Sequence, residues 1–352
     1  MKKWILVALA FGFCCFPLQG WTSGPDDWGY RYKTSRDIGG PVFNWRDISG
    51  VGEHLVMLDD DNEGPFSLGF QFVFYGQAFD SVFVCSNGWL SFTSRSHQFH
   101  HFLIPDTREP NCLQAPFWTD LDPSRAGSVF VYQDSSEFAA SWLGVPHRHG
   151  LVPFTFQAIL LGDGSVMFQY LSMEDSTRLD SSSVGIESGE GDMGLNFLFN
   201  GEPEAAIEDS LAIRFYTVTH DVNPIVIHSP LEKLFISVPS NPAVSIKNYG
   251  SVTESPTITC TVRDSSSFLP LYADTVVVSD LGCRDTVLAS FKEWIPDEGA
   301  CLVQFITSLA SNDDASLDTL QRYCRVSKHA DMAHDDGGPE GWYIVSGSPA
   351  ST

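Results

Sequence analysis

The chain has 352 residues, of which 20 are Lys or Arg and 44 are Asp or Glu, so its formal net charge is −24. This shortage of bases excludes a protein that holds a nucleic-acid backbone, because such binding needs clustered Lys and Arg. With 43% hydrophobic and 13% aromatic residues, the chain is also too apolar to be intrinsically disordered.

Residues 1–20 have the pattern of a secretory signal peptide. Lys2 and Lys3 form a basic start, an apolar run follows over 4–16, and the helix-breaking Pro17 comes shortly before the small residue Gly20. The apolar run is too short for a resident membrane helix, and no later segment reaches membrane length. We therefore predict an exported protein, secreted or held at the cell surface, with no membrane span.

Residues 21–217 are predicted to form one domain. A polar, aromatic lead over 21–63 is followed by short apolar runs, and helical periodicity is almost absent. The runs cover 66–75, 81–85, 89–93, 129–133, 138–142, 154–161, 165–170, 183–187, 195–199 and 210–216. Asn87-Gly88 and Asp163-Gly164 separate pairs of runs and favour hairpin turns. Strands without intervening helices predict an all-β protein that begins with a larger β-sandwich or jelly-roll-like domain.

Residues 218–329 are predicted to form a second domain, with 218–227 as the join. Seven shorter runs follow, at 235–238, 243–248, 257–263, 272–278, 286–293, 301–307 and 320–326. Seven strands in about a hundred residues are typical of an immunoglobulin-like β-sandwich. Residues 330–352 are expected to be a flexible tail. Segment 338–343 resembles segment 24–30, so the tail is either the start of a truncated repeat or a chance match.

Six cysteines lie beyond the signal peptide, and their even number in an exported chain favours disulfides over a metal site. Within the first domain the available pair is Cys85 with Cys112. The second domain holds Cys260, Cys283, Cys301 and Cys324, which allow three pairings. Cys260 with Cys301 is preferred, because each lies in a strand-like run.

A series of motifs in constant order carries a family resemblance. They are DDDNEGPFSLGFQFVFYGQAFDSVFVCSNGWLSF (59–92), APFWTDLDP (115–123), GSVFVY (127–132), FTFQAIL (154–160), DGSVMFQY (163–170), VGIE (184–187) and SLAIRF (210–215). Over about residues 24–217 the chain resembles a module of large secreted and surface proteins of bacteria, which is broadly similar to the extracellular nidogen-type domain.

Residues 221–327 resemble the cell-adhesion-related, immunoglobulin-like domains of bacterial exoproteins. The residues that carry this likeness are Ser229-Pro230, the turn Asn248-Tyr249-Gly250, and Asn312-Asp313. Together the two resemblances imply extracellular display and binding on a bacterial surface protein, rather than a defined reaction.

Calcium is the cofactor that the acidic residues suggest. The run from Asp59 to Glu63 places hard oxygen ligands directly before a strand, and we take Asp59, Asp61 and Glu63 as its candidate ligands. Asp120 and Asp122 form a second, separate acidic pair. The spacing is not that of an EF-hand, so a solvated acidic loop is the alternative interpretation.

Histidines and further acidic pairs suggest other kinds of chemistry, beside plain structural roles. The histidines fall in two short stretches, at 97, 100 and 101 and at 147 and 149, and could surround a transition metal. Asp120 with Asp122, or Glu187 with Glu190, could act as the paired carboxylates of a glycosidase. Neither a G-x-S-x-G elbow nor a phosphate-binding loop occurs. Most aromatic side chains are expected in the sandwich cores.

The predicted function is a noncatalytic extracellular or cell-surface module for binding or adhesion, with no catalytic residues. Its expected partner is an unidentified extracellular protein or a glycan. Two alternatives stay open: a secreted, glycosidase-like hydrolase that uses paired carboxylates, and a structural spacer within a larger exoprotein.

Overall fold

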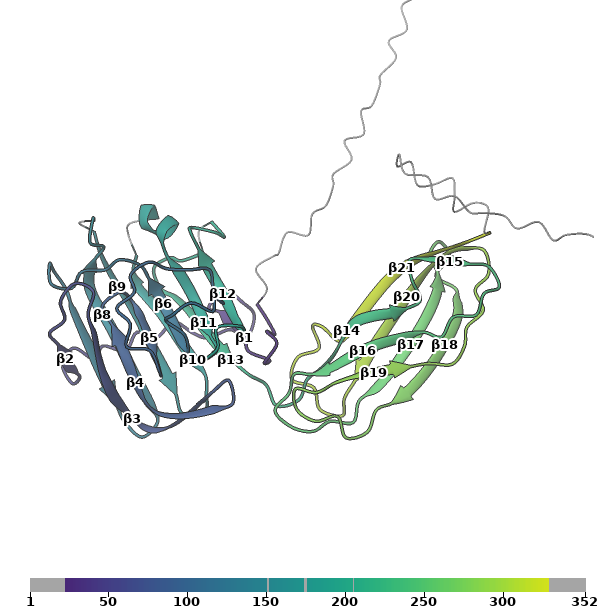
Figure 1. Ribbon diagram of the computed structural model, residues 1–352, viewed down its shortest axis with the longest axis horizontal. Coiled ribbons are helices and arrows are strands. Elements are labelled where there is room, and N and C mark those ends of the chain that lie inside the picture. Colours follow the sequence, from purple (N-terminus) through teal and green to yellow (C-terminus); the bar gives the residue numbers. More distant parts are fainter. Residues whose placement is uncertain (1–22, 151, 174–175, 205, 329–352) are drawn as a thin grey trace, which may run out of the picture. The chain divides into compact units, whose positions relative to one another are not determined.

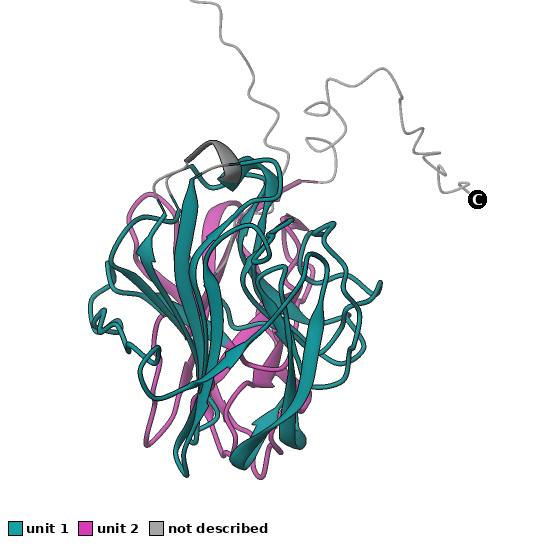
Figure 2. Cartoon of the chain, turned by 90° about the vertical axis from the view of Figure 1, so that its left-hand side faces the viewer, with its two compact units in different colours: residues 1–26, 31–215 teal, residues 27–30, 216–352 magenta. Residues whose placement is uncertain are grey.

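The computed structural model describes residues 23–150, 152–173, 176–204 and 206–328, and it divides the chain into two compact units (Figures 1 and 2). Unit 1 comprises residues 1–26 and 31–215, and unit 2 comprises residues 27–30 and 216–352. The regular elements of the described residues are β-strands and one short 3₁₀ helix, Ser176–Ser181, which confirms the all-β prediction. No helix in these ranges is long and apolar enough to cross a bilayer. The predicted signal peptide and tail lie outside the described residues.

Unit 1 contains two antiparallel sheets (Figure 1). The seven-stranded sheet has the order β1-β13-β10-β9-β8-β7-β2 and the six-stranded sheet the order β12-β11-β6-β5-β4-β3. The bounds in chain order are β1 Arg31–Thr34, β2 Glu53–Leu55, β3 Asn62–Phe74, β4 Gln77–Cys85, β5 Trp89–Ser91, β6 Leu113–Trp118, β7 Ser128–Gln133, β8 Glu137–Pro146, β9 Pro153–Leu161, β10 Val166–Ser172, β11 Ser183–Glu187, β12 Gly194–Phe199 and β13 Leu211–Tyr216.

Aromatic side chains fill the space between the two sheets. Phe117 on β6 packs against Phe154 and Phe156 on β9, with ring centroids 5.0 and 5.5 Å apart. The Trp142 indole on β8 donates a hydrogen bond to the Cys85 carbonyl on β4 over 3.2 Å. Because the polar atom of this buried ring finds a partner across the core, burial of the indole leaves no donor unsatisfied.

Three strands of unit 1 were missing from the sequence prediction. β1 and β2 are the two edges of the seven-stranded sheet and lie in the polar, aromatic lead, for which no strand was predicted. Strands of three or four residues are too short to display a periodicity. All six residues of β6 are buried, so this strand shows no alternation of apolar and polar positions.

Unit 2 is an immunoglobulin-like sandwich of a three-stranded sheet, β14-β16-β19, and a five-stranded sheet, β15-β21-β20-β17-β18 (Figure 1). The bounds are β14 Val222–Ser229, β15 Lys233–Phe235, β16 Ala243–Asn248, β17 Thr257–Asp264, β18 Pro270–Val277, β19 Thr286–Ser290, β20 Gly299–Ser308 and β21 Thr319–Ser327. The predicted join is strand β14, which pairs with β16. Pro224 is tolerated there because β14 is a sheet edge, the kind of strand in which proline is found.

Candidate cation site

Three carboxylates meet at the ends of unit 1 strands. Asp59 and Asp60 lie in the turn before β3, and Asp120 follows β6. One carboxylate oxygen of each lies within 4.8 Å of the others. The acidic run before β3 and the acidic pair after β6, which the sequence offered as separate candidates, therefore converge in space.

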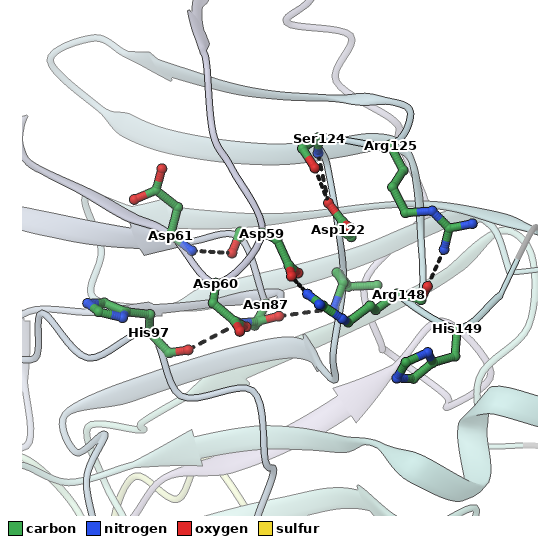
Figure 3. A network of polar contacts seen from close by, with 12 residues as sticks. Asp59, Asp60, Asp61, Asn87, His97, Asp122, Ser124, Arg125, Arg148 and His149 are labelled. Atoms are coloured by element: carbon green, nitrogen blue, oxygen red, sulfur yellow. Dashed lines mark hydrogen bonds and ion pairs between the residues drawn. The ribbon is translucent and has the colours of Figure 1, made fainter.

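Asn87 holds the loops around this cluster together (Figure 3). Its side chain is fully buried, and its Nδ2 donates to Asp60 Oδ1 over 2.9 Å and to the His97 carbonyl over 3.2 Å. Its Oδ1 accepts from the backbone N–H of Leu121 over 3.0 Å. The Asn-Gly pair that was predicted as a hairpin turn between β4 and β5 thus also fixes the loop that carries Asp120.

The backbone of these turns requires particular residues. Gly88 has φ +77°, and a Cβ added there would lie 2.0 Å from the Phe117 carbonyl oxygen, so no larger residue fits. Asp60 has φ +51°, a left-handed conformation that Asp adopts more readily than most side chains. The turn residues therefore determine where the carboxylates point.

The cluster carries more negative than positive charge. The Arg148 guanidinium forms an ion pair with Asp59 (Figure 3). The backbone N–H of Arg148 donates to the backbone carbonyl of Asp120 over 2.8 Å. Burial, followed by the nearby Asp60 charge, raises the pKa of the Asp120 carboxyl. Oδ1 of Asp59 and Oδ1 of Asp120 are buried without a hydrogen-bond partner. Two acceptor atoms therefore remain for a cation to satisfy.

The structure places only one of the three predicted calcium ligands in the cluster. Asp61 accepts hydrogen bonds from the N–H groups of Leu58 and Asn62, over 3.1 and 2.9 Å, and so caps its own turn. Glu63 is exposed and lies opposite Val84 in the β3–β4 pairing. Asp60 and Asp120 take the places predicted for Asp61 and Glu63 beside Asp59. Both are visible in the sequence as acids next to buried strands, but their proximity to each other depends on sheet order.

The histidines do not form a three-imidazole site. Within the described ranges, the group of acidic, His or Cys side chains close enough to share an ion contains no histidine. His101 Nε2 contacts Asn200 Oδ1 at 2.7 Å, and the His147 ring accepts from the His149 N–H over 3.0 Å. His100 and His149 lie close enough to Asp120 to offset part of the rise in its pKa, so they border the acid cluster.

The paired carboxylates of the hydrolase alternative are not presented together to solvent. Asp122 is 6% exposed and accepts from the N–H and hydroxyl of Ser124. Glu187 is 2% exposed and accepts from the Asp106 N–H over 2.6 Å, whereas Glu190 is exposed. Burial raises the pKa of Glu187 to about 8. A substrate bound at the surface would not reach Asp122 or Glu187.

The two predicted cysteine pairs are not brought together. Cys85 is on β4 and Cys112 directly precedes β6, and β5 lies between those strands. Two strand spacings are roughly 9.5 Å, beyond the reach of a disulfide. Cys260 lies opposite Phe305, whereas Cys301 lies opposite Asp264 at the other end of the same pairing.

Comparison with known proteins finds a family model that is similar to most of unit 1. Residues 42–213 match the family model described as NIDO related. Human and mouse alpha-tectorin are each 24% identical over 139 residues, an alignment that covers 32% of this chain and 6% of the relative. The chain thus spans only a small part of the curated relatives that it matches.

Solved structures align with about a third of the chain. The CARDB domain of a Pyrococcus furiosus protein is 15% identical, and the alignment covers 32% of this chain and 94% of that chain with a TM-score of 0.26. A β-glucosidase from Listeria innocua is 13% identical over 30% of this chain and 16% of that chain, with a TM-score of 0.20. The family match confirms the nidogen-type resemblance over residues 42–213.

Proposed function

We propose that this protein is a noncatalytic binding module of the extracellular space or the cell surface. The observation that carries the proposal is the match of residues 42–213 to the NIDO-related family, together with the similarity to part of alpha-tectorin. The burial of Asp122 and Glu187 supports a noncatalytic role, because a hydrolase needs two accessible carboxylates. The partner is an extracellular protein or a glycan.

Screening the purified full chain against arrays of glycans and extracellular matrix proteins tests this function. We expect saturable binding to at least one class and no turnover of polysaccharides. Polysaccharide hydrolysis that Asp120→Asn or Glu187→Gln abolishes would instead establish the hydrolase. Absence of both binding and turnover would support the structural-spacer alternative.

We further propose that Asp59, Asp60 and Asp120 bind calcium. Ligand oxygens on opposite sides of a calcium ion lie about 4.6–5.2 Å apart, since each bond is about 2.3–2.6 Å long. The separation of up to 4.8 Å among the three carboxylates suits that geometry. Arg148 now neutralises Asp59, so an incoming ion competes with its guanidinium for this carboxylate.

Calorimetric titration of calcium into the chelator-treated full chain tests the site. We expect Asp120→Asn to abolish the binding heat and the calcium-dependent rise in melting temperature. Without calcium, the same variant should be at least as stable as the wild type, because the charge near Asp60 is gone. Calcium at 100 times its Kd would stabilise the wild type by about 2.7 kcal/mol.

Two variants serve as controls for the calcium titration. Glu63→Gln removes an acid of the same run that is exposed outside the cluster, so it should leave calcium binding unchanged. Arg148→Gln removes the competing guanidinium and should retain or strengthen binding. If the wild type and Arg148→Gln both show no calcium heat and no shift in melting temperature, the cluster is a solvated acidic loop.

A further inference from the structure

Two cysteines of unit 2 face each other across a pair of neighbouring strands. Cys301 on β20 lies directly opposite Cys324 on β21 in their antiparallel register. Both side chains belong to the hydrophobic core of unit 2, with exposures of 2% and 3%. The two thiols lie close enough for each to shift the pKa of the other.

This register satisfies the main geometric condition for a disulfide. Directly opposite residues in antiparallel strands have Cα atoms about 4.5–5.5 Å apart. Disulfides join residues whose Cα atoms are about 4.4–6.8 Å apart. We propose that Cys301 and Cys324 form an intramolecular disulfide that links β20 to β21 within the core of unit 2.

The other cysteines of unit 2 are less suitable partners. Cys260 lies opposite Phe305, four residues along β20 from Cys301, which corresponds to roughly 13 Å. Cys283 is exposed, in the connection between β18 and β19, whereas Cys301 and Cys324 are both buried. Strand register therefore selects one of the pairings that the sequence left open.

The bond forms by thiol–disulfide exchange with a small or protein-borne disulfide as oxidant. One cysteine thiolate attacks the oxidant, forms a mixed disulfide and releases one thiol. The second cysteine, as its thiolate, then attacks the first sulfur and releases the other thiol. The two protein thiols lose two electrons and two protons, and the oxidant is reduced to two thiols. Because both sulfurs are buried in the folded unit, we expect exchange before the sandwich closes.

The cross-link would fasten the last strand of unit 2 to the sheet. β21 pairs with β20 on one side and, in parallel, with the short β15 on the other. The disulfide closes the loop between residues 301 and 324. It thereby reduces the conformational entropy of the unfolded chain, which favours the folded state. Its formation in the cell rests on the proposed extracellular setting, where disulfides persist, but its formation in vitro does not.

Tryptic mapping of the full chain tests the pairing without any substitution. Cys260, Cys283, Cys301 and Cys324 fall in four different tryptic peptides, covering 248–263, 264–284, 293–322 and 323–325. The protein is refolded with oxidised and reduced glutathione, its free thiols are blocked, and it is digested without reduction. We expect peptide 293–322 to be linked to 323–325. A link from 293–322 to either other peptide, or blocked thiols at both 301 and 324, would overturn the proposal.

Thermal unfolding gives a second readout. Reductant should lower the melting temperature of the oxidised wild type by roughly 10 °C. It should leave the Cys301→Ser/Cys324→Ser double variant unchanged, and the exposed control Cys283→Ser should respond like the wild type. Equal responses of the wild type and the double variant would contradict the proposal. If the double variant does not fold, the peptide map of the wild type decides.

Discussion

Glu187 and Asp120 are both carboxyls with a raised pKa, but their surroundings differ. Glu187 ends strand β11, is almost fully buried, and accepts the N–H of Asp106. Asp120 is only partly buried and faces other acids. The ionisation of Glu187 is therefore expected to affect folding stability, whereas the charge of Asp120 is expected to affect cation binding.

Stability should fall as pH rises through the window set by Glu187. Burial raises its pKa from 4.5 to about 8, so the folded protein keeps a proton that the unfolded chain has lost. The stabilising contribution is complete below pH 4.5 and is lost as pH rises towards about 8. The slope is at most roughly 1.4 kcal/mol per pH unit.

Urea unfolding at several pH values measures this effect. Glu187→Gln has no titrating proton, so its stability should decline less between pH 5 and 8 than that of the wild type. Glu190→Gln alters an exposed acid nearby and should retain the wild-type slope. Identical slopes for the wild type and Glu187→Gln would show that Glu187 is ionised in the folded protein.

At the scale of elements, the backbone carbonyl of Gln98 anchors segment 94–101, which contains three of the histidines. The indoles of Trp89 and Trp118 both donate to the Gln98 carbonyl, each over 3.0 Å. Trp89 begins β5 and Trp118 ends β6, so neighbouring strands hold segment 94–101 against the sheet. The same segment contributes the His97 carbonyl to Asn87, which links it to the acid cluster.

Trp118→Phe should loosen segment 94–101. The substitution keeps an aromatic ring but removes one of two donors to Gln98, and it leaves a small cavity. We expect faster amide hydrogen exchange across the segment and a loss of roughly 1–3 kcal/mol of stability. Trp142→Phe is the matched control, because its indole donates to the Cys85 carbonyl instead. Equal changes in segment exchange for both variants would contradict a local tether.

At the scale of the whole molecule, acidic residues far outnumber basic ones. A net charge of −24 makes the folded chain repel itself, and the few bases leave many acids without an opposite charge nearby. Each unit nevertheless builds its own core, because the apolar side chains of its two sheets bury one another. This repulsion lowers the stability of the folded state, and dissolved salt screens it.

Sodium chloride should therefore stabilise the protein. Raising ionic strength from about 0.01 to 0.15 M shortens the Debye length from about 30 to 8 Å, which screens repulsion between separated acids. Scanning calorimetry should show a higher melting temperature at the higher salt in wild type and Asp120→Asn alike. This general effect differs from the calcium effect, which Asp120→Asn should abolish. A melting temperature that falls with salt would mean that favourable ion pairs outweigh the repulsion.

Local sequence signals determined the fold class and several turns. Alternating apolar runs predicted most strands, and Asn87-Gly88 and Asp163-Gly164 do lie between paired strands. These features depend on neighbouring residues, whose conformational preferences the sequence contains. The short edge strands β1 and β2 and the fully buried β6 were missed because they offer too little local pattern.

Only the tertiary structure decided which side chains meet. Asp59 and Asp120 are far apart in the chain, and their approach depends on the loops that Asn87 joins. The cysteines show the same dependence, since strand register places Cys324, rather than Cys260, opposite Cys301. Sequence by itself determined an acidic all-β chain with a nidogen-type motif series. Strand order and register, which arise from packing between distant segments, determined its candidate cation site and its candidate disulfide.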